Sequence, residues 1–274
     1  MGKPSVFRRA DKLKKVAGMR NRMESTGVSG KILVFGMFSL ILIFAGCTGQ
    51  NPAGAPQISV VDMNYSAGGM RISAERCQPA NATADTPAVV LTGGDGVDVK
   101  KLRPVCEEFA RQGFVALAHD NVNNGSVEQN VQAVVGGIDE LTQERAQRKV
   151  ALWAHSAGTI FSAFAAFMRP AQVSAFVETS GHMQIPICDT PNGVRDEDCL
   201  AYWSEFPAPI LIVHGLNDTV VDPSFAQAFN ARLERMGKAH QMRLVDGKGH
   251  EFMMDRPDVV RQEVEFLKNN SGGA

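Results

Sequence analysis

A short stretch of the chain, residues 149–168 (KVALWAHSAGTIFSAFAAFM), constrains its fold more than any other. An apolar strand pattern runs directly into Ser156, and an apolar helix pattern follows at once. Ala154 and Gly158 stand two residues before and after that serine, and a sharp turn from strand to helix needs such small residues there. The pattern predicts a tight turn that holds Ser156 at the positive end of the helix, where the N–H of Ala157 can face a negative charge. A serine that only caps the helix is the alternative.

Two later loops supply an acid and a histidine. Residues 209–223 (PILIVHGLNDTVVDP) form an apolar strand that opens into a polar loop, which places Asp218 just past the strand's carboxyl end, where sites of open parallel sheets lie. A second apolar run at 241–245 precedes a Gly-rich loop that carries His250. Sixty-two residues separate Ser156 from Asp218 and 32 separate Asp218 from His250, enough for a strand and a helix in each interval. The order serine, acid, histidine predicts a triad in which His250 is the base and Asp218 orients it.

The chain at this point resembles the α/β-hydrolase family, and within it the compact dienelactone-hydrolase-like and related esterase group. The resemblance covers about residues 58–268 and rests on four segments, at 113–126 (GFVALAHDNVNNGS), 154–158 (AHSAG), 214–223 (HGLNDTVVDP) and 247–252 (GKGHEF). It implies a mostly parallel twisted sheet with helices on both faces and a short cap insertion. It also implies hydrolysis of small or medium carboxylic esters by acyl transfer, without a cofactor. Dienelactone hydrolases carry a cysteine where this chain has Ser156, so their particular substrate is not expected.

The resemblance also bears on the oxyanion hole and on the acid. Alignment with the turn after the third strand places the second oxyanion-hole N–H at Gly94, beside that of Ala157. Without the resemblance, the Gly-rich sequence at 92–96 is only a tight turn. Some hydrolases of this fold keep the triad acid at the end of the strand after the nucleophile's helix, which makes Glu178 the alternative to Asp218.

A connection at 181–208 is long for a compact domain and is therefore expected to be functional. Hydrolases of this fold place caps at this position. Its aromatic residues are candidates for an acyl or aromatic pocket, namely His182, Tyr202 and Trp203. Alternatively, these side chains pack the loop onto the domain.

The remaining pattern predicts one domain over residues 58–270. Two β segments near 58–64 and 69–78 come first, and strands then alternate with helices. Alternation at these lengths indicates a parallel sheet covered on both faces. The predicted strands lie at 87–92, 114–118, 149–154, 173–179, 210–214 and 241–246, and the predicted helices at 98–112, 126–146, 157–168, 223–237 and 257–268.

The first part of the chain is typical of an export signal. Residues 1–31 are basic, residues 32–45 are apolar, and an Ala-Gly-Cys triplet ends at Cys47. The apolar run of 14 residues is shorter than the roughly 20 that cross a bilayer as a helix. Small residues before Cys47 resemble a lipobox, so we expect residues 1–46 to be removed and Cys47 to be lipidated. Residues 47–57 would then form a flexible tether to an extracytoplasmic membrane surface.

Cysteine usage agrees with export, because lipidation of one cysteine leaves four, an even number that suits an oxidising compartment. Cys188 and Cys199 bracket a polar loop and are expected to form a disulfide. Cys77 and Cys106 would be the second pair, although Cys106 also fits a buried thiol. The sequence contains no CxxC pairing or His-x-x-x-His spacing, so no structural or catalytic metal site is expected.

The net charge of the chain restricts the classes of partner that it is expected to bind. Removal of the signal would leave 19 basic and 27 acidic residues, a formal charge of about −8. A negatively charged surface does not attract nucleic acid, and membrane attachment would depend on the lipid. The expected partner is a small-molecule ester, and the oligomeric state is left open. The 228 residues of the mature chain suit one α/β domain with a large core.

Overall fold

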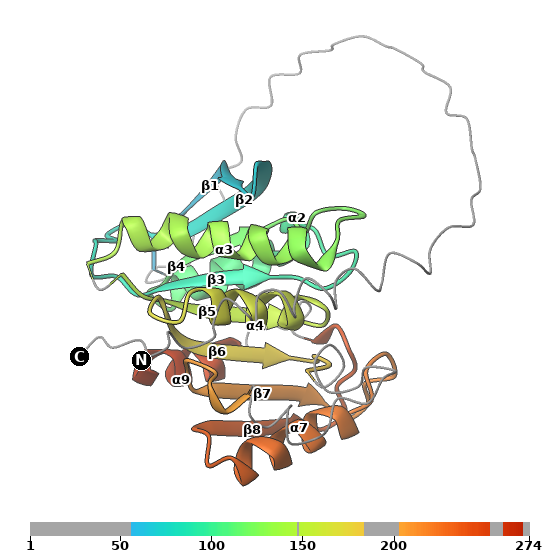
Figure 1. Ribbon diagram of the computed structural model, residues 1–274. Helices are drawn as coiled ribbons and strands as arrows, with labels where there is room; N and C mark the ends of the chain where they lie inside the picture. The colour runs from blue at the N-terminus through green and yellow to red at the C-terminus, as the bar shows by residue number, and fades with distance from the viewer. Residues whose placement is uncertain (1–55, 147, 184–202, 253–259, 271–274) are drawn as a thin grey trace, which may run out of the picture. The chain divides into compact units, whose positions relative to one another are not determined.

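An eight-stranded sheet organises the residues that the computed structural model describes, which are 56–146, 148–183, 203–252 and 260–270 (Figure 1). The strand order is β1-β2-β4-β3-β5-β6-β7-β8. The first two strands, β1 (Ile58–Ala67) and β2 (Met70–Pro79), form an antiparallel hairpin, and β2 pairs antiparallel with β4. The other six strands run parallel, so their carboxyl ends meet along one edge.

The central strands are largely apolar and are buried because helices cover both faces of the sheet. Every residue of β3, β4, β5 and β7 is buried, whereas the edge strand β8 is only partly covered. The bounds are Ala88–Thr92 for β3, Val115–His119 for β4, Val150–His155 for β5, Val173–Thr179 for β6, Ile210–Gly215 for β7 and His240–Val245 for β8.

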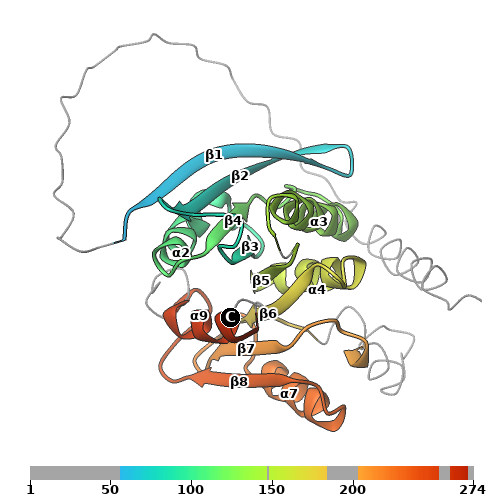
Figure 2. The same ribbon diagram turned by 90° about the vertical axis from the view of Figure 1, so that its left-hand side faces the viewer.

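Two layers of helices enclose the sheet (Figure 2). Helices α2 (Val99–Arg111) and α9 (Val260–Asn270) cover one face, and α3 (Val127–Gln143), α4 (Gly158–Met168) and α7 (Ser224–Arg235) cover the other. Polar side chains fix where α2 and α3 begin. The Asp98 side chain accepts a hydrogen bond from the N–H of Lys101, and Ser126 and Gln129 form a reciprocal capping box.

The fold class expected from the sequence is confirmed, since the sheet is mostly parallel and has helices on both faces. Each predicted strand and helix is present. Boundaries differ by a few residues: the helix predicted over 126–146 ends at Gln143, and the helix predicted over 257–268 ends at Asn270. Residues 257–259, where the last helix is predicted to begin, lie outside the described residues. Most of the expected cap, residues 184–202, lies outside the described residues.

One disulfide joins the sheet to a helix among the residues that are described. Cys77 of β2 and Cys106 of α2 are bonded, with their Cα atoms 5.7 Å apart. Both are fully buried, and Cys106 is therefore not the free thiol that was its alternative. The expected Cys188–Cys199 bridge and the lipidation site Cys47 fall outside the described residues.

In the described part of the chain, no helix is both long enough and apolar enough to cross a bilayer.

Candidate active site

Ser156 occupies a strained turn between β5 and α4. Its φ is +53°, in the left-handed region that residues with a Cβ seldom adopt. Hydrogen bonds on both sides hold the turn: the N–H of Ser156 donates to the carbonyl of Thr179 (2.9 Å), and its carbonyl accepts from the hydroxyl of Thr159 (2.7 Å). This turn presents the Ser156 side chain at the carboxyl edge of the sheet.

Close backbone contacts explain why small residues surround the serine. A Cβ on Gly158 would lie 2.4 Å from the carbonyl oxygen of Gly93, so no larger residue fits there. A Cβ on Gly94 would lie 2.6 Å from the Cβ of Ser156. The Gly-rich turn after β3 therefore packs its backbone directly against Ser156.

The acid, the histidine and the serine meet at this edge although they are far apart in sequence. His250 lies in the loop after β8, and its Nε2 is 3.0 Å from the Oγ of Ser156. Its Nδ1 is 2.8 Å from Oδ2 of Asp218, which follows β7. With Nδ1–H donated to the carboxylate, the Nε2 lone pair can accept the hydroxyl proton of Ser156. The geometry thus supports proton transfer from serine to histidine, with an anion behind the ring.

Asp218 is held as an anion by the loop around it. Its side chain is buried, and Oδ1 accepts hydrogen bonds from the N–H groups of Val220 and Val221, both at 2.9 Å. Burial alone would raise the pKa of Asp218, but these two N–H groups and His250 outweigh burial and lower it. His214 of β7 adds a further neighbour, with its Nε2 3.2 Å from Oδ2 of Asp218.

Glu178, the alternative acid, occupies a different environment. Its Oε1 accepts a hydrogen bond from the N–H of Gly181 (2.7 Å), and its buried Oε2 has no hydrogen-bond partner among the residues described. Burial raises the pKa of Glu178 to about 8. No described hydrogen bond joins Glu178 to His250, whose Nδ1 is bonded to Asp218. The structure therefore brings Asp218, and not Glu178, to the histidine.

We expect Glu178→Gln to remove a pH-dependent loss of stability. Between the ordinary glutamate pKa of 4.5 and the folded value of about 8, the folded protein keeps the proton and the unfolded chain releases it, so stability falls as the pH rises. Glutamine cannot ionise. The Tm of the variant should match that of the parent near pH 5 and exceed it by several degrees at pH 8, as thermal unfolding at both pH values would show.

The exposed Glu265 offers a matched control for this experiment. The Glu265→Gln variant should follow the parent at both pH values. A Tm difference between the Glu178→Gln variant and the parent that stays constant from pH 5 to pH 8 would contradict a protonated Glu178.

Asn121, from the loop after β4, fixes the turn that faces Ser156. Its Nδ2 donates to the carbonyls of Gly93 (2.9 Å) and Gly94 (3.1 Å). The N–H groups of Gly94 and Ala157 donate to no residue that the structure describes. They are thus available to a developing oxyanion. The sequence provided no reason to place Asn121 or His214 in the active site. The sequence feature that could have identified Asn121 is its place as a polar residue just past β4, the strand beside β3.

The three candidate pocket residues differ in their surroundings. Trp203 is 1% exposed, and its ring packs 5.3 Å from that of Phe206 and 4.8 Å from that of Phe229. Trp203 therefore packs in the core, as in the alternative in which these side chains hold the loop on the domain. The ring of His182 lies against that of Phe225, with centroids 3.7 Å apart. Tyr202 lies outside the described residues.

Comparison with known proteins identifies the family of this chain. The family model described as the prolyl oligopeptidase family matches residues 119–274, more than half of the chain. This match includes the serine, the acid and the histidine of the candidate site. A search of curated proteins found no match.

Several solved structures similar to this chain are described as hydrolases, esterases or peptidases. A Klebsiella pneumoniae protein described as a dienelactone hydrolase has a TM-score of 0.64 at 13% identity, covering 80% of this chain and all of its own. A thermophilic esterase of Thermogutta terrifontis, with butyrate bound, has a TM-score of 0.58 at 19% identity, covering 79% and 94%. An acylaminoacyl peptidase of Pyrococcus horikoshii has a TM-score of 0.60 at 12% identity, covering 78% of this chain and 42% of its own. The resemblance expected from the sequence, to dienelactone-hydrolase-like and esterase α/β-hydrolases, is confirmed at the level of fold.

Proposed function

Because this chain belongs to the prolyl oligopeptidase family of serine hydrolases, we propose that it hydrolyses carboxylic esters with small or medium acyl or aryl groups. One observation carries the proposal. His250 lies between the other two groups, with Nε2 3.0 Å from the Oγ of Ser156 and Nδ1 2.8 Å from the carboxylate of Asp218. These are the distances that nucleophile, base and orienting acid need.

The proposed reaction has two halves. In the first, the Oγ of Ser156 attacks the ester carbonyl carbon while Nε2 of His250 takes the hydroxyl proton. The carbonyl oxygen becomes an oxyanion, which accepts hydrogen bonds from the N–H groups of Gly94 and Ala157. The bond to the leaving alcohol then breaks, His250 returns its proton to that alcohol, and the acyl group stays on Ser156.

Water completes the second half. It attacks the acyl-enzyme while His250 takes one of its protons, and the free acid leaves as the proton returns to the Oγ of Ser156. Asp218 stays ionised throughout. Its negative charge stabilises the imidazolium form of His250 in both halves. Hydrogen bonds from the N–H groups of Val220 and Val221 stabilise the Asp218 carboxylate itself.

Amide or thioester cleavage is the second candidate. The same groups could attack such carbonyls, the family is named after a peptidase, and an acylaminoacyl peptidase shares the fold. That peptidase is longer, since this chain spans 42% of its length. A hydrolase-fold binding lipoprotein without turnover is the third candidate. An intact set of serine, histidine and acid disfavours it.

A matched substrate panel separates these candidates. We expect turnover of 4-nitrophenyl esters from acetate to decanoate, with a maximum at short or medium acyl length. N-acetyl-aminoacyl 4-nitroanilides should release no measurable nitroaniline. Measurable release from the anilides would assign amide cleavage instead, and faster turnover of acyl thioesters would assign a thioesterase. A folded protein that turns over none of these substrates would be the binding protein.

We further propose that the protein is exported and anchored by lipid on Cys47. The Cys77–Cys106 disulfide supports export, because disulfides persist in oxidising compartments. Expressed in a bacterial host, the full chain should partition into detergent and incorporate labelled fatty acid. The Cys47→Ala variant should lose both properties, and retention of both would overturn the lipid anchor.

A further inference from the structure

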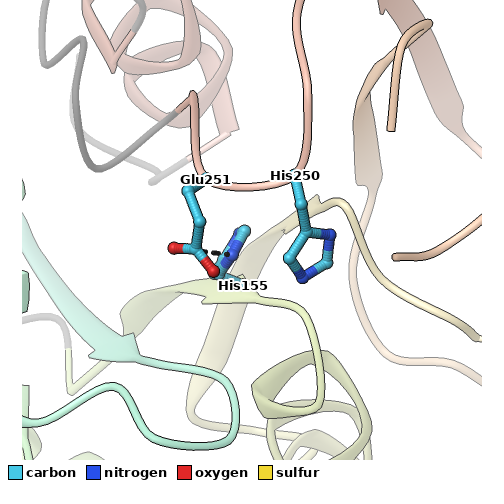
Figure 3. Close-up of side chains that lie close together, drawn as sticks. All are labelled: His155, His250 and Glu251. Carbon is cyan, nitrogen blue, oxygen red and sulfur yellow. Dashed lines mark ion pairs between the residues drawn. The ribbon is translucent and has the colours of Figure 1, made fainter. Parts of the chain in front are cut away.

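Two residues next to the reacting groups have no part in the proposed reaction, yet they meet beside it. His155 directly precedes Ser156, and Glu251 directly follows His250. Figure 3 shows the side chains of His155, His250 and Glu251 gathered where the end of β5 meets the loop after β8. Nε2 of His155 lies 3.8 Å from Oε2 of Glu251, and its ring centroid lies 4.9 Å from that of His250.

Hydrogen bonding fixes the tautomer of His155. Its Nδ1 is 3.2 Å from the hydroxyl oxygen of Thr179. The Thr179 hydroxyl donates its single hydrogen to the carbonyl of Ala154 (3.0 Å), so its oxygen can only accept from the ring. Nδ1 of His155 therefore carries the hydrogen, and Nε2 presents a lone pair.

This lone pair faces another acceptor. Nε2 of His155 is buried and has no hydrogen-bond partner among the described residues, and the nearby Glu251 oxygen, at 3.8 Å, is beyond hydrogen-bonding distance. A buried acceptor without a donor is costly, and a carboxylate next to it adds to the negative potential. A cation between the two groups would satisfy both.

His250 can supply a third ligand atom. Its Nδ1–H is held by Asp218, just as that of His155 is held by Thr179. Metal-binding histidines typically donate the outer N–H to an oxygen in this way and coordinate through the other nitrogen. One ligand atom from each of His155, His250 and Glu251 lies within 4.8 Å of the others.

The ligand types indicate the metal. Two imidazole nitrogens and one carboxylate oxygen are a common set for Zn²⁺, and ligand atoms about 2 Å from a tetrahedral ion stand roughly 3.3 Å apart. The largest separation in the set must therefore shrink by up to about 1.5 Å. Glu251 can contribute to this movement, because its side chain is 56% exposed.

We propose that His155, His250 and Glu251 form a site for a divalent transition-metal ion with the preferences of Zn²⁺, and that metal bound there inhibits the enzyme. Coordination would occupy Nε2 of His250, which could then no longer take the proton of Ser156. Inhibition rests on the proposed hydrolase function. Metal binding does not, since it depends only on the three ligands.

Binding is tested first, in full-length protein that carries Ser156→Ala, so that turnover plays no part. Calorimetric titration with Zn²⁺ should show one ion per chain, and Co²⁺ should give the visible absorption of a tetrahedral site. Adding Glu251→Gln removes the charged ligand and should weaken Zn²⁺ binding at least tenfold. Asp246→Asn, which removes an exposed carboxylate from the same loop, is the matched control and should bind as before. Equal affinities in all three proteins, or no binding, would overturn the site.

Inhibition is tested second, with an aryl ester and each protein's own metal-free rate as reference. Zn²⁺ should inhibit the parent and the Asp246→Asn protein at the same concentrations, and a chelator should restore the rate. The Glu251→Gln protein should need at least tenfold more Zn²⁺ for half-inhibition. Equal inhibition of all three would overturn the inhibitory role of this site. Zn²⁺ binding without ester turnover in any protein would instead count against the proposed hydrolase function and leave the metal site standing.

Discussion

Replacing Ser156 with alanine should abolish ester hydrolysis while the domain stays folded. We expect kcat/KM to fall by about 10⁵-fold or more, because only substrate binding and the oxyanion hole would still contribute. Alanine keeps the Cβ and therefore the same strain at φ +53°, so the Tm should change by no more than a few degrees. Initial rates on an aryl ester and thermal unfolding of the purified variant check both expectations.

Ser66 offers a control, since it is exposed on the edge strand β1 and away from the site. Ser66→Ala should leave the rate and the Tm unchanged. If Ser156→Ala hydrolyses the ester at the parental rate, Ser156 is not the nucleophile.

Asp218→Asn should lower kcat by about 10⁴-fold near neutral pH, the loss seen when a triad acid is neutralised without losing its shape. The amide can still accept hydrogen bonds from the N–H groups of Val220 and Val221, so the loop should keep its structure. What it loses is the negative charge 2.8 Å from Nδ1 of His250, which fixes the tautomer and stabilises the imidazolium. Steady-state kinetics of the purified variant would measure the effect.

Glu178→Gln is the matched comparison, because it neutralises the other acid at a carboxyl strand end. It should cost far less activity, since Glu178 is bonded to the N–H of Gly181 and its raised pKa favours the neutral form. Losses in the reverse order would move the orienting role to Glu178. Small losses in both variants, with Ser156 still essential, would indicate a Ser–His dyad.

Local chemistry explains why much of this fold and site could be predicted from the sequence. The apolar strand before Ser156 and the small residues around it already specify a sharp turn, because Gly158 faces the backbone of the turn after β3. Asp218 and His250 each follow an apolar run. Parallel strands end along one edge, so residues that follow them converge whatever their separation in sequence.

The missed features depend on which strands become neighbours. Asn121 follows β4, and it reaches the Gly93–Gly94 turn only because β4 lies beside β3 in the sheet. The cluster of His155 with Glu251 similarly requires the loop after β8 to lie over the end of β5. Neighbouring residues on a strand point to opposite faces, which argues against His155 as the base for Ser156. This alternation does not say which distant residue lies on the same side as His155.

The surroundings of the aromatic residues could not be predicted from the sequence for a different reason. Trp203 fits a pocket and a core equally well by its residue type. The packing of Trp203 against Phe229 of α7 is a tertiary contact, and it places Trp203 in the core at 1% exposure. The periodicity of the sequence cannot make that distinction.

Covalent labelling with a fluorophosphonate tests the central claim most directly, because such probes react with a serine activated by a neighbouring base. Intact mass of the labelled full-length protein should show one adduct per chain, and peptide mapping should locate it on Ser156. Loss of ester hydrolysis should follow adduct formation one to one, and the Ser156→Ala protein should acquire no adduct. An adduct at another residue, or full hydrolytic activity without any adduct at Ser156, would contradict a nucleophilic Ser156 in this site.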